Sequence, residues 1–322
     1  MASYKLGSRG DEVKRIQEKL AADGFYKGPV DGDFGGGTEA AVGAFQKARG
    51  LGVDGVVGAI TWAAMFRDEI PEPAILSKPV DYKTLALTGS FETDKGVPEC
   101  FAGLSGDFDG QGISFGVLQW NFGQESLQPL LNEMIGAHSE AMAGIFQANY
   151  TVLRQALMAD KRELMTFVRS IQHPVQHYVY EPWRGMFKSL GRTEEFQDIQ
   201  RKYSAQLFQS ALKLCAEYGL WSERAVALMF DIKVQNGSIS DLVKAQILKE
   251  IEGLPKDMPD ADSELQKMRI VANRRAEAAN PRWVEDVRAR KLCCANGGGI
   301  VHGIDFDLEE QFGIRLKKRE GI

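Results

Sequence analysis

Two carboxylic acids, Glu92 and Asp109, occur seventeen positions apart in contrasting sequence surroundings. Glu92 follows the apolar residues Leu85, Leu87 and Phe91, so we expect its carboxyl group at the edge of an apolar pocket, which would raise its pKa. Asp109 lies in the polar segment Asp-Phe-Asp-Gly-Gln-Gly, which would keep a carboxylate ionised. Hydrolysis of a glycosidic bond uses one protonated and one ionised carboxyl group. The pair therefore suits hydrolysis of a glycosidic bond, with Glu92 as the candidate for the protonated carboxyl group and Asp109 for the ionised one.

Each carboxylate alone also has a simpler structural interpretation. A Glu at a helix end is usually a solvated charge, and Asp-Gly usually marks a turn. Asp107, two positions before Asp109, is an alternative base. The segment Gly112-Ile-Ser114-Phe-Gly116, which follows directly, strengthens the pair. The same G-x-S-x-G spacing could indicate a serine nucleophile, but that motif needs a parallel α/β sheet with His and acidic partners. The helical surroundings argue against it.

Amide and aromatic side chains that could bind sugars occur in two further places. They offer hydrogen-bond donors, acceptors and a flat stacking face. The candidate substrate-binding residues are Gln119, Trp120, Asn121, Gln235 and Asn236.

Helices must position these residues, because helical periodicity dominates the chain beyond residue 84. No run alternates long enough for a large sheet, although Ile113–Trp120 could form a short hairpin. The chain is therefore expected to be mainly α. The predicted helices are Ser126–Ile135, His138–Met158, Lys161–Ile171, Glu194–Tyr218, Ser222–Lys233, Asp241–Glu252 and Asp262–Ala278.

The first part of the chain contains an internal repeat with the pattern V-D-G-x-x-G-x-x-T-x-x-A. One copy begins at Val30 and the other at Val53. Asp-Gly is turn chemistry in which glycine supplies a positive φ, so Gly32 and Gly55 are predicted turn residues. The threonine of each copy is expected to cap the helix that follows.

Three short helices are predicted around these turns, and together they would form a small bundle. Their inward residues are expected to be Val13, Ile16 and Leu20, then Ala41, Phe45 and Ala48, then Trp62, Met65 and Phe66. We predict a small domain over residues 1–67 and a proline-containing linker over 68–83. A larger helical domain is predicted over 84–322.

The small domain resembles the peptidoglycan-binding domain common on cell-wall hydrolases. The matching segments are Leu6–Val13, Ile16–Leu20, Val30–Gly35, Ala44–Gln46 and Val53–Trp62. In that family a groove between turns and helices takes the peptide stem. The resemblance suggests Asp31, Phe34 and Gln46 as wall contacts.

The large domain resembles the lysozyme-like superfamily, most closely the helical two-lobed chitosanases. In those enzymes a catalytic Glu ends a helix and an Asp follows in D-G-x-G-x-T-x-G. The corresponding residues here are Asp109-Gly-Gln-Gly-Ile-Ser114-Phe-Gly116. The resemblance implies Glu92 as acid and Asp109 as base. Ser114 replaces the threonine that helps to position the attacking water.

The composition argues against several other functions. The 322 residues are 44% hydrophobic and 26% charged, as in ordinary globular proteins, and the net charge of −5 argues against nucleic acid as the main partner. No apolar run is long enough for a transmembrane helix, so no stable membrane anchor is expected. The four Cys and four His lack metal-ligand spacing, so we expect no metal and no cofactor.

The combined resemblance is to a modular phage-type endolysin. It implies a muramidase that cleaves the β-1,4 bond between N-acetylmuramic acid (MurNAc) and N-acetylglucosamine (GlcNAc) in peptidoglycan. Inversion would follow if the two carboxyl groups were roughly 6.5–9.5 Å apart. A lytic transglycosylase, a chitosanase and a non-catalytic wall-binding protein are the alternatives. We expect a monomer made in the host cytoplasm without a signal peptide and released to the wall through holin-type lesions. An effector delivered by a bacterial secretion machine is the alternative.

Overall fold

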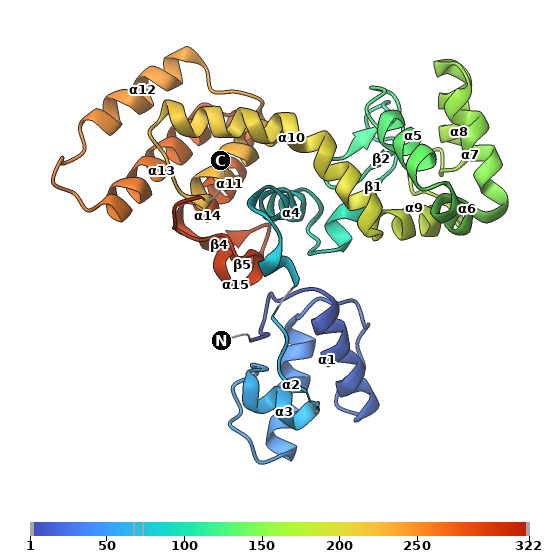
Figure 1. The fold of residues 1–322 in the computed structure, drawn as a ribbon, viewed down its shortest axis with the longest axis horizontal. Helices are drawn as coiled ribbons and strands as arrows, with labels where there is room; N and C mark the ends of the chain where they lie inside the picture. The colour runs from blue at the N-terminus through green and yellow to red at the C-terminus, as the bar shows by residue number, and fades with distance from the viewer. Residues whose placement is uncertain (1–2, 67, 73, 320–322) are drawn as a thin grey trace. The chain divides into compact units, whose positions relative to one another are not determined.

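The computed structural model describes residues 3–66, 68–72 and 74–319, and these residues form mainly helices (Figure 1). The predicted mainly α fold is confirmed, because the strands are short and belong to sheets of three and two strands. The chain divides into two compact units. The first comprises Met1–Lys83, Cys215–Leu228 and Ile239–Ile322, and the second Thr84–Leu214 and Met229–Ser238.

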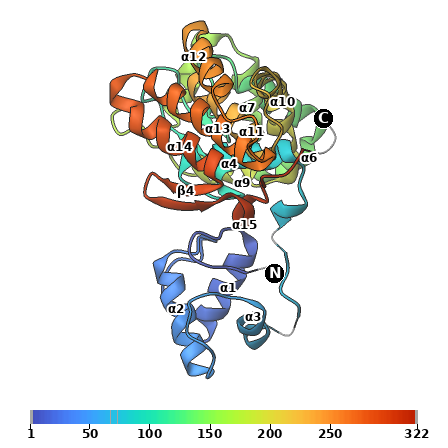
Figure 2. The same ribbon diagram turned by 90° about the vertical axis from the view of Figure 1, so that its left-hand side faces the viewer.

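The repeat region of the first unit forms three helices, α1 (Asp11–Ala22), α2 (Gly36–Ala48) and α3 (Ala59–Met65), visible together in Figure 2. Acidic residues in the first turn of α1 and Lys19 in its last turn complement the helix dipole. The predicted inward residues are buried, except that Ala48 is exposed and Phe66 is half-buried. The small core of this region contains Val13, Ile16, Leu20, Phe34, Val42, Phe45 and Trp62.

The repeat glycines are turn residues as predicted, whereas the prediction that the repeat threonines cap the helices is wrong. Gly32 and Gly55 have φ of 77° and 72°. However, glycines occupy the N-cap positions of α2 and α3, and neither helix has a side-chain cap. Thr38 and Thr61 instead lie inside the first turns of α2 and α3, where both side chains are buried. Their hydroxyl groups accept hydrogen bonds from two buried glutamines.

The predicted linker contains a 3₁₀ turn, Ala74–Ser77, and the first turn of α4 (Val80–Thr93). Residue 67, the predicted end of the small domain, and residue 73 of the linker lie outside the described residues.

The C-terminal part of the first unit is a helical layer followed by a hairpin. Helix α13 packs along α14, and α12 packs against α13. Gly297, in the left-handed conformation, ends α14. The elements are α12 (Asp241–Glu252), α13 (Asp260–Glu277), α14 (Val284–Asn296), β4 (Gly298–Val301), β5 (Ile304–Asp307) and α15 (Leu308–Phe312).

The second unit packs helices around an aromatic core. Phe115 stacks on Phe196 with ring centroids 5.5 Å apart, and Phe146 meets Phe187 edge to face. The predicted helix His138–Met158 is interrupted at Gln147, whose φ is 47°. The helices are α5 (Gln128–Ala137), α6 (Ser139–Phe146), α7 (Tyr150–Met158), α8 (Lys161–Ser170), α9 (Trp183–Gly191), α10 (Glu194–Glu217) and α11 (Glu223–Asn236), of which α10 and α11 also contribute residues to the first unit.

No helix in the described ranges has both the length and the hydropathy needed to cross a membrane.

Candidate active site

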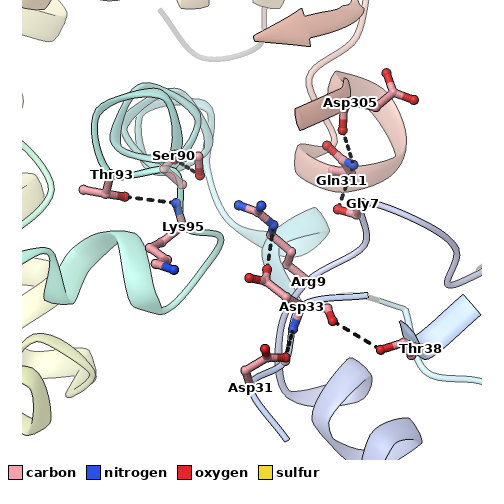
Figure 3. A network of polar contacts seen from close by, with 12 residues as sticks. Gly7, Arg9, Asp31, Asp33, Thr38, Ser90, Thr93, Lys95, Asp305 and Gln311 are labelled. Atoms are coloured by element: carbon pink, nitrogen blue, oxygen red, sulfur yellow. Dashed lines mark hydrogen bonds and ion pairs between the residues drawn. The ribbon is translucent and has the colours of Figure 1, made fainter. Parts of the chain in front are cut away.

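Glu92 lies in the last turn of α4, where its side chain is exposed. The expected apolar pocket around this carboxyl group is therefore wrong, because it is the preceding Phe91 that is buried. Two hydroxyl groups near the end of α4 donate back to carbonyl groups one turn earlier. Ser90 donates to Ala86 O at 2.8 Å, and Thr93 donates to Gly89 O at 2.7 Å while accepting from the Lys95 amide (Figure 3). These bonds fix the helix end that carries Glu92.

Two glycines let the end of α4 approach a small sheet. A Cβ on Gly89 would lie 2.0 Å from the Val117 side chain, so only glycine allows this contact. A Cβ on Gly103 would lie 2.7 Å from Thr93 and 2.9 Å from the Gln119 amide. Gly103 thus brings Thr93 and Gln119 together. The helix end with Glu92 is held beside the loop that contains Gln119.

The sheet consists of β1 (Leu104–Ser105), β2 (Ser114–Phe115) and β3 (Trp120–Asn121). All neighbours are antiparallel. Because successive side chains alternate between faces, Leu104, Phe115 and Trp120 share the face that packs on the aromatic core. The opposite face carries a polar row of Ser105, Ser114 and Asn121.

Asp109 lies in the loop that joins β1 to β2, and Asp107 fixes the conformation of that loop. Asp107 Oδ1 accepts from the Gly112 amide at 2.9 Å, and its Oδ2 lies 3.8 Å from Arg169 Nε. The Asp107 amide donates to Gln172 Oε1 at 2.9 Å. Its side chain is only 9% exposed. Asp107 is thus held by the protein itself, which disfavours it as the alternative base.

Asp109 and Ser114 are more accessible. Asp109 is exposed, and its Oδ1 accepts one hydrogen bond, from the Gln111 amide at 3.0 Å. Ser114 is half-buried, and its hydroxyl group has no hydrogen-bond partner within the described ranges. Ser114 faces Ser105 across the base of the loop. An accessible carboxylate and an available hydroxyl group therefore belong to one hairpin.

The predicted sugar-binding segment 119–121 is mainly structural. Asn121 is 6% exposed, and its side-chain amide donates to Gln124 Oε1 and accepts from the Gln124 backbone amide. The sugar contact predicted for it stays a prediction. Trp120 is partly buried and packs against the aromatic core. Gln119 has a φ of 55° and donates to Gly116 O at 2.8 Å. A positive φ at a residue other than glycine is strained and is often found at functional sites.

Gln235 and Asn236 form the last residues of α11, and both are half-buried. The Asn236 Oδ1 atom is buried without a hydrogen-bond partner among the described residues. Gly237, with a φ of 75°, follows the helix. The roles predicted for these two amides stay predictions.

Two buried glutamines that sequence analysis missed support the site. Gln200 on α10 accepts from the Val117 amide at 2.8 Å and donates to Phe101 O at 3.1 Å. Gln172 accepts from the Asp107 amide. Each amide ties together segments that are far apart in sequence. The buried part of α10 around Gln200 also carries Gln197 and Ser204, so no isolated polar residue marks this position in the sequence.

In the repeat region, the first copy is organised by the buried Gln17. Its amide nitrogen donates to Asp31 Oδ1 at 2.9 Å and to Thr38 Oγ1 at 3.2 Å. Its carbonyl oxygen accepts from the amides of Asp31 and Gly32. Asp33 beside this turn is paired with Arg9, and Figure 3 shows the ion pair together with the Asp31 and Thr38 contacts.

Gln46 does the same in the second copy. Its amide nitrogen donates to Asp54 Oδ1 at 2.7 Å and to Thr61 Oγ1 at 3.0 Å, and its oxygen accepts from the Asp54 and Gly55 amides. Gln46 and Phe34 are each 1% exposed, and the wall contacts predicted for them stay predictions. Asp31 is exposed and remains a candidate.

A groove of about 600 Å³ opens beside the first copy. It contains aromatic, cationic and carboxylate groups, which suits a ligand of mixed character. Asp31 is one of its lining residues. The others include Phe25, Tyr26, Lys27, Pro29, Asp33 and Thr38.

Comparison with known proteins identifies the repeat region. Residues 9–65 match the family described as "Putative peptidoglycan binding domain". The spore cortex-lytic enzyme of Bacillus cereus is 49% identical over 55 residues, which are 17% of this chain and 21% of that protein. The N-acetylmuramoyl-L-alanine amidase CwlM of Mycobacterium tuberculosis is 38% identical over 76 residues, 20% of this chain and 19% of the relative. The chain thus spans about a fifth of the length of these curated relatives.

A solved chitosanase complex is similar to a larger part of the chain. The similarity covers 72% of this chain and 98% of the chitosanase, with a TM-score of 0.44 and 15% sequence identity.

Proposed function

We propose that this protein is a peptidoglycan hydrolase that cleaves the β-1,4 bond between MurNAc and GlcNAc. Glu92 donates a proton to the oxygen of the departing sugar as the bond from that oxygen to the anomeric carbon breaks. Asp109 takes a proton from a water molecule, whose oxygen forms the new bond to the anomeric carbon. Ser114 hydrogen-bonds to this water, and the configuration is inverted.

The observation that carries this proposal is the β1–β2 hairpin. Asp107 fixes its loop from inside, Asp109 is exposed on it, and the Ser114 hydroxyl group is available at its base. The exposed Glu92 at the end of α4 is accessible to a glycan strand from solvent.

The repeat region supports cell wall as the location of the substrate. A module that binds peptidoglycan raises the local concentration of the attached enzyme on an insoluble polymer. The groove beside the first repeat is our candidate for the wall contact, with Asp31 among its residues. We also propose delivery as a phage-type endolysin, made in the host cytoplasm and released to the wall, because this order of modules suits that route.

The test is analysis of digested sacculi by mass spectrometry and reducing-end assay. Wild-type protein is expected to release muropeptides with reducing MurNAc ends, and Glu92→Gln to lose at least about 100-fold in rate, because general acid catalysis contributes about that much or more. Glu140→Gln, an exposed glutamate on α6, is the matched control and should keep full activity.

Different products would contradict the proposal in different ways. Anhydromuramyl ends would indicate a lytic transglycosylase, in which Glu92 acts without Asp109. Release of sugars from chitosan but not from sacculi would indicate a chitosanase. Binding of sacculi without any cleavage would leave a wall-binding protein.

A further inference from the structure

Two groups of aromatic rings lie in the Asp109 loop and in the segment 172–180, which touch at Gly106. Phe108 packs on His177 with ring centroids 5.1 Å apart. His173 stacks on Tyr178 at 5.1 Å, and Tyr178 meets Tyr180 edge to face at 5.5 Å. We call these five residues the aromatic platform.

Two of the five rings are exposed, and the other three are half-buried. Phe108 is 73% exposed and Tyr178 is 51% exposed, and Val175 in the same loop is 76% exposed. Large apolar side chains gathered at a surface commonly mark a binding site. The exposure of Phe108 also means that its ring contributes little to the core.

The platform is held in place by the contacts that fix the hairpin loop. A Cβ on Gly106 would lie 1.6 Å from the His177 carbonyl oxygen, so the two loops touch at their backbones. The Gln172 side chain accepts from the Asp107 amide, which joins the loops a second time. A surface fixed in this way loses little conformational entropy when a ligand binds.

We infer that the aromatic platform binds a sugar ring of the glycan strand, an inference that rests on the proposed hydrolase function. A pyranose has an apolar C–H face and a polar rim of hydroxyl groups, so it suits rings that also carry polar edges. Phe108 directly precedes Asp109 in the same loop, and both side chains are exposed, so a sugar on Phe108 would be held by the segment that carries the proposed base.

His173 adds a defined donor to the platform. Its Nδ1 atom accepts hydrogen bonds from the amides of Val175 and Gln176, at 3.2 and 3.0 Å. The neutral ring therefore carries its proton on Nε2. That N–H group, with the Tyr178 hydroxyl group, is suited to sugar hydroxyl groups.

The test measures binding of a soluble hexasaccharide of alternating GlcNAc and MurNAc, without peptide stems, to full-length Glu92→Gln by calorimetry. Adding Phe108→Leu, which removes the flat ring, is expected to raise Kd about five- to tenfold, whereas Phe108→Tyr should stay within about twofold. Trp283→Ala is the matched control, because Trp283 is 51% exposed and lies in the first unit. Melting temperatures should not change, since the Phe108 ring is exposed.

Kinetics on the same hexasaccharide separate the two proposals. With Glu92 intact, Phe108→Leu is expected to raise KM by a similar factor and to change kcat less. Cleavage by the wild type with Kd and KM insensitive to Phe108 would overturn the platform and leave the hydrolase standing. Phe108-dependent binding without cleavage would support the platform and overturn the hydrolase. Absence of hexasaccharide binding to Glu92→Gln would overturn the platform.

Discussion

Two aspartates in one loop have different environments, although only Phe108 separates them in sequence. Asp107 is largely buried, with a carboxylate that accepts a backbone hydrogen bond and lies near Arg169. Asp109 is exposed and accepts only from the nearby Gln111 amide. The first aspartate is suited to holding the loop and the second to reacting with a ligand.

This difference predicts two distinct defects. Asp109→Asn should lower the rate of sacculus cleavage at least about 100-fold and leave the melting temperature unchanged. Asp107→Asn keeps an acceptor for the Gly112 amide but loses the charge near Arg169, so it should destabilise the protein by at most about 1 kcal/mol and retain part of the activity. Activity and calorimetric melting measured on both variants check the prediction. Equal loss of activity in both, without loss of stability, would show that Asp107 takes part in the chemistry.

Sequence analysis could find the candidate acid and base but not their environments. The pattern around Asp109 marks a loop, and the expected polar surroundings agree with its exposure. The apolar pocket expected for Glu92 failed because α4 is buried on all sides from Tyr82 to Phe91, and Glu92 lies where the helix ends and becomes exposed. Asn121 is predicted as a sugar ligand, and its side chain closes a local turn through Gln124. Its role depends on local geometry that composition does not encode.

At the scale of elements, the repeat is a pair of turns, each built around one buried amide. Gln17 and Gln46 each bind the aspartate, the glycine and the threonine of their own copy. The sequence pattern identified the turn and its positive-φ glycine correctly. It misassigned the threonines as caps, because the glutamine that binds each threonine lies outside the matching pattern.

The turn of the second repeat copy, which contains Asp54, should make the free energy of unfolding decrease at acid pH. Hydrogen bonds from the Val56 amide, and then from the Gln46 side chain, lower the pKa of Asp54 below its ordinary value. A lowered folded-state pKa adds stability above the unfolded pKa of about 3.9, and this stability is lost as pH falls through the folded value. Melting temperatures of Asp54→Asn should therefore fall less than those of the wild type below about pH 4.

The control for that prediction is Asp257→Asn, which removes one negative charge from an exposed turn and should melt like the wild type throughout. Identical pH profiles for Asp54→Asn and the wild type would mean that the Gln46 contact contributes no acid-sensitive stability.

At the scale of the whole molecule, the peptidoglycan-binding match and the proposed site of glycan cleavage involve different stretches of chain. The peptidoglycan-binding match covers residues 9–65, whereas Glu92, Asp109 and the aromatic platform lie in the second unit. Sequence analysis separated these functions because the repeat has a distinctive pattern. It did not anticipate that residues after 214 would divide between two compact units, since helical periodicity carries no information on which helices pack together.

The separation predicts variants that affect wall affinity alone. Lys27 is exposed in the groove, and peptide stems of peptidoglycan carry carboxylates, so Lys27→Glu should weaken sacculus binding about two- to fivefold. Cleavage of the soluble hexasaccharide should not change. Lys47→Glu, an exposed residue of α2 outside the groove lining, is the matched control. Equal binding of both variants in a sacculus pull-down would place the wall contact elsewhere.

The two glutamine-centred turns differ in the number of residues between the glutamine and the aspartate that it binds. Gln17 and Asp31 are fourteen positions apart, whereas Gln46 and Asp54 are eight apart. The six additional residues fall in the segment that supplies Phe25, Tyr26, Lys27 and Pro29 to the groove. Duplication of one turn thus left a scaffold copy and a copy with a longer insert. Such a module can change its ligand through the length and content of this insert, while the glutamine contacts that hold the fold together stay the same.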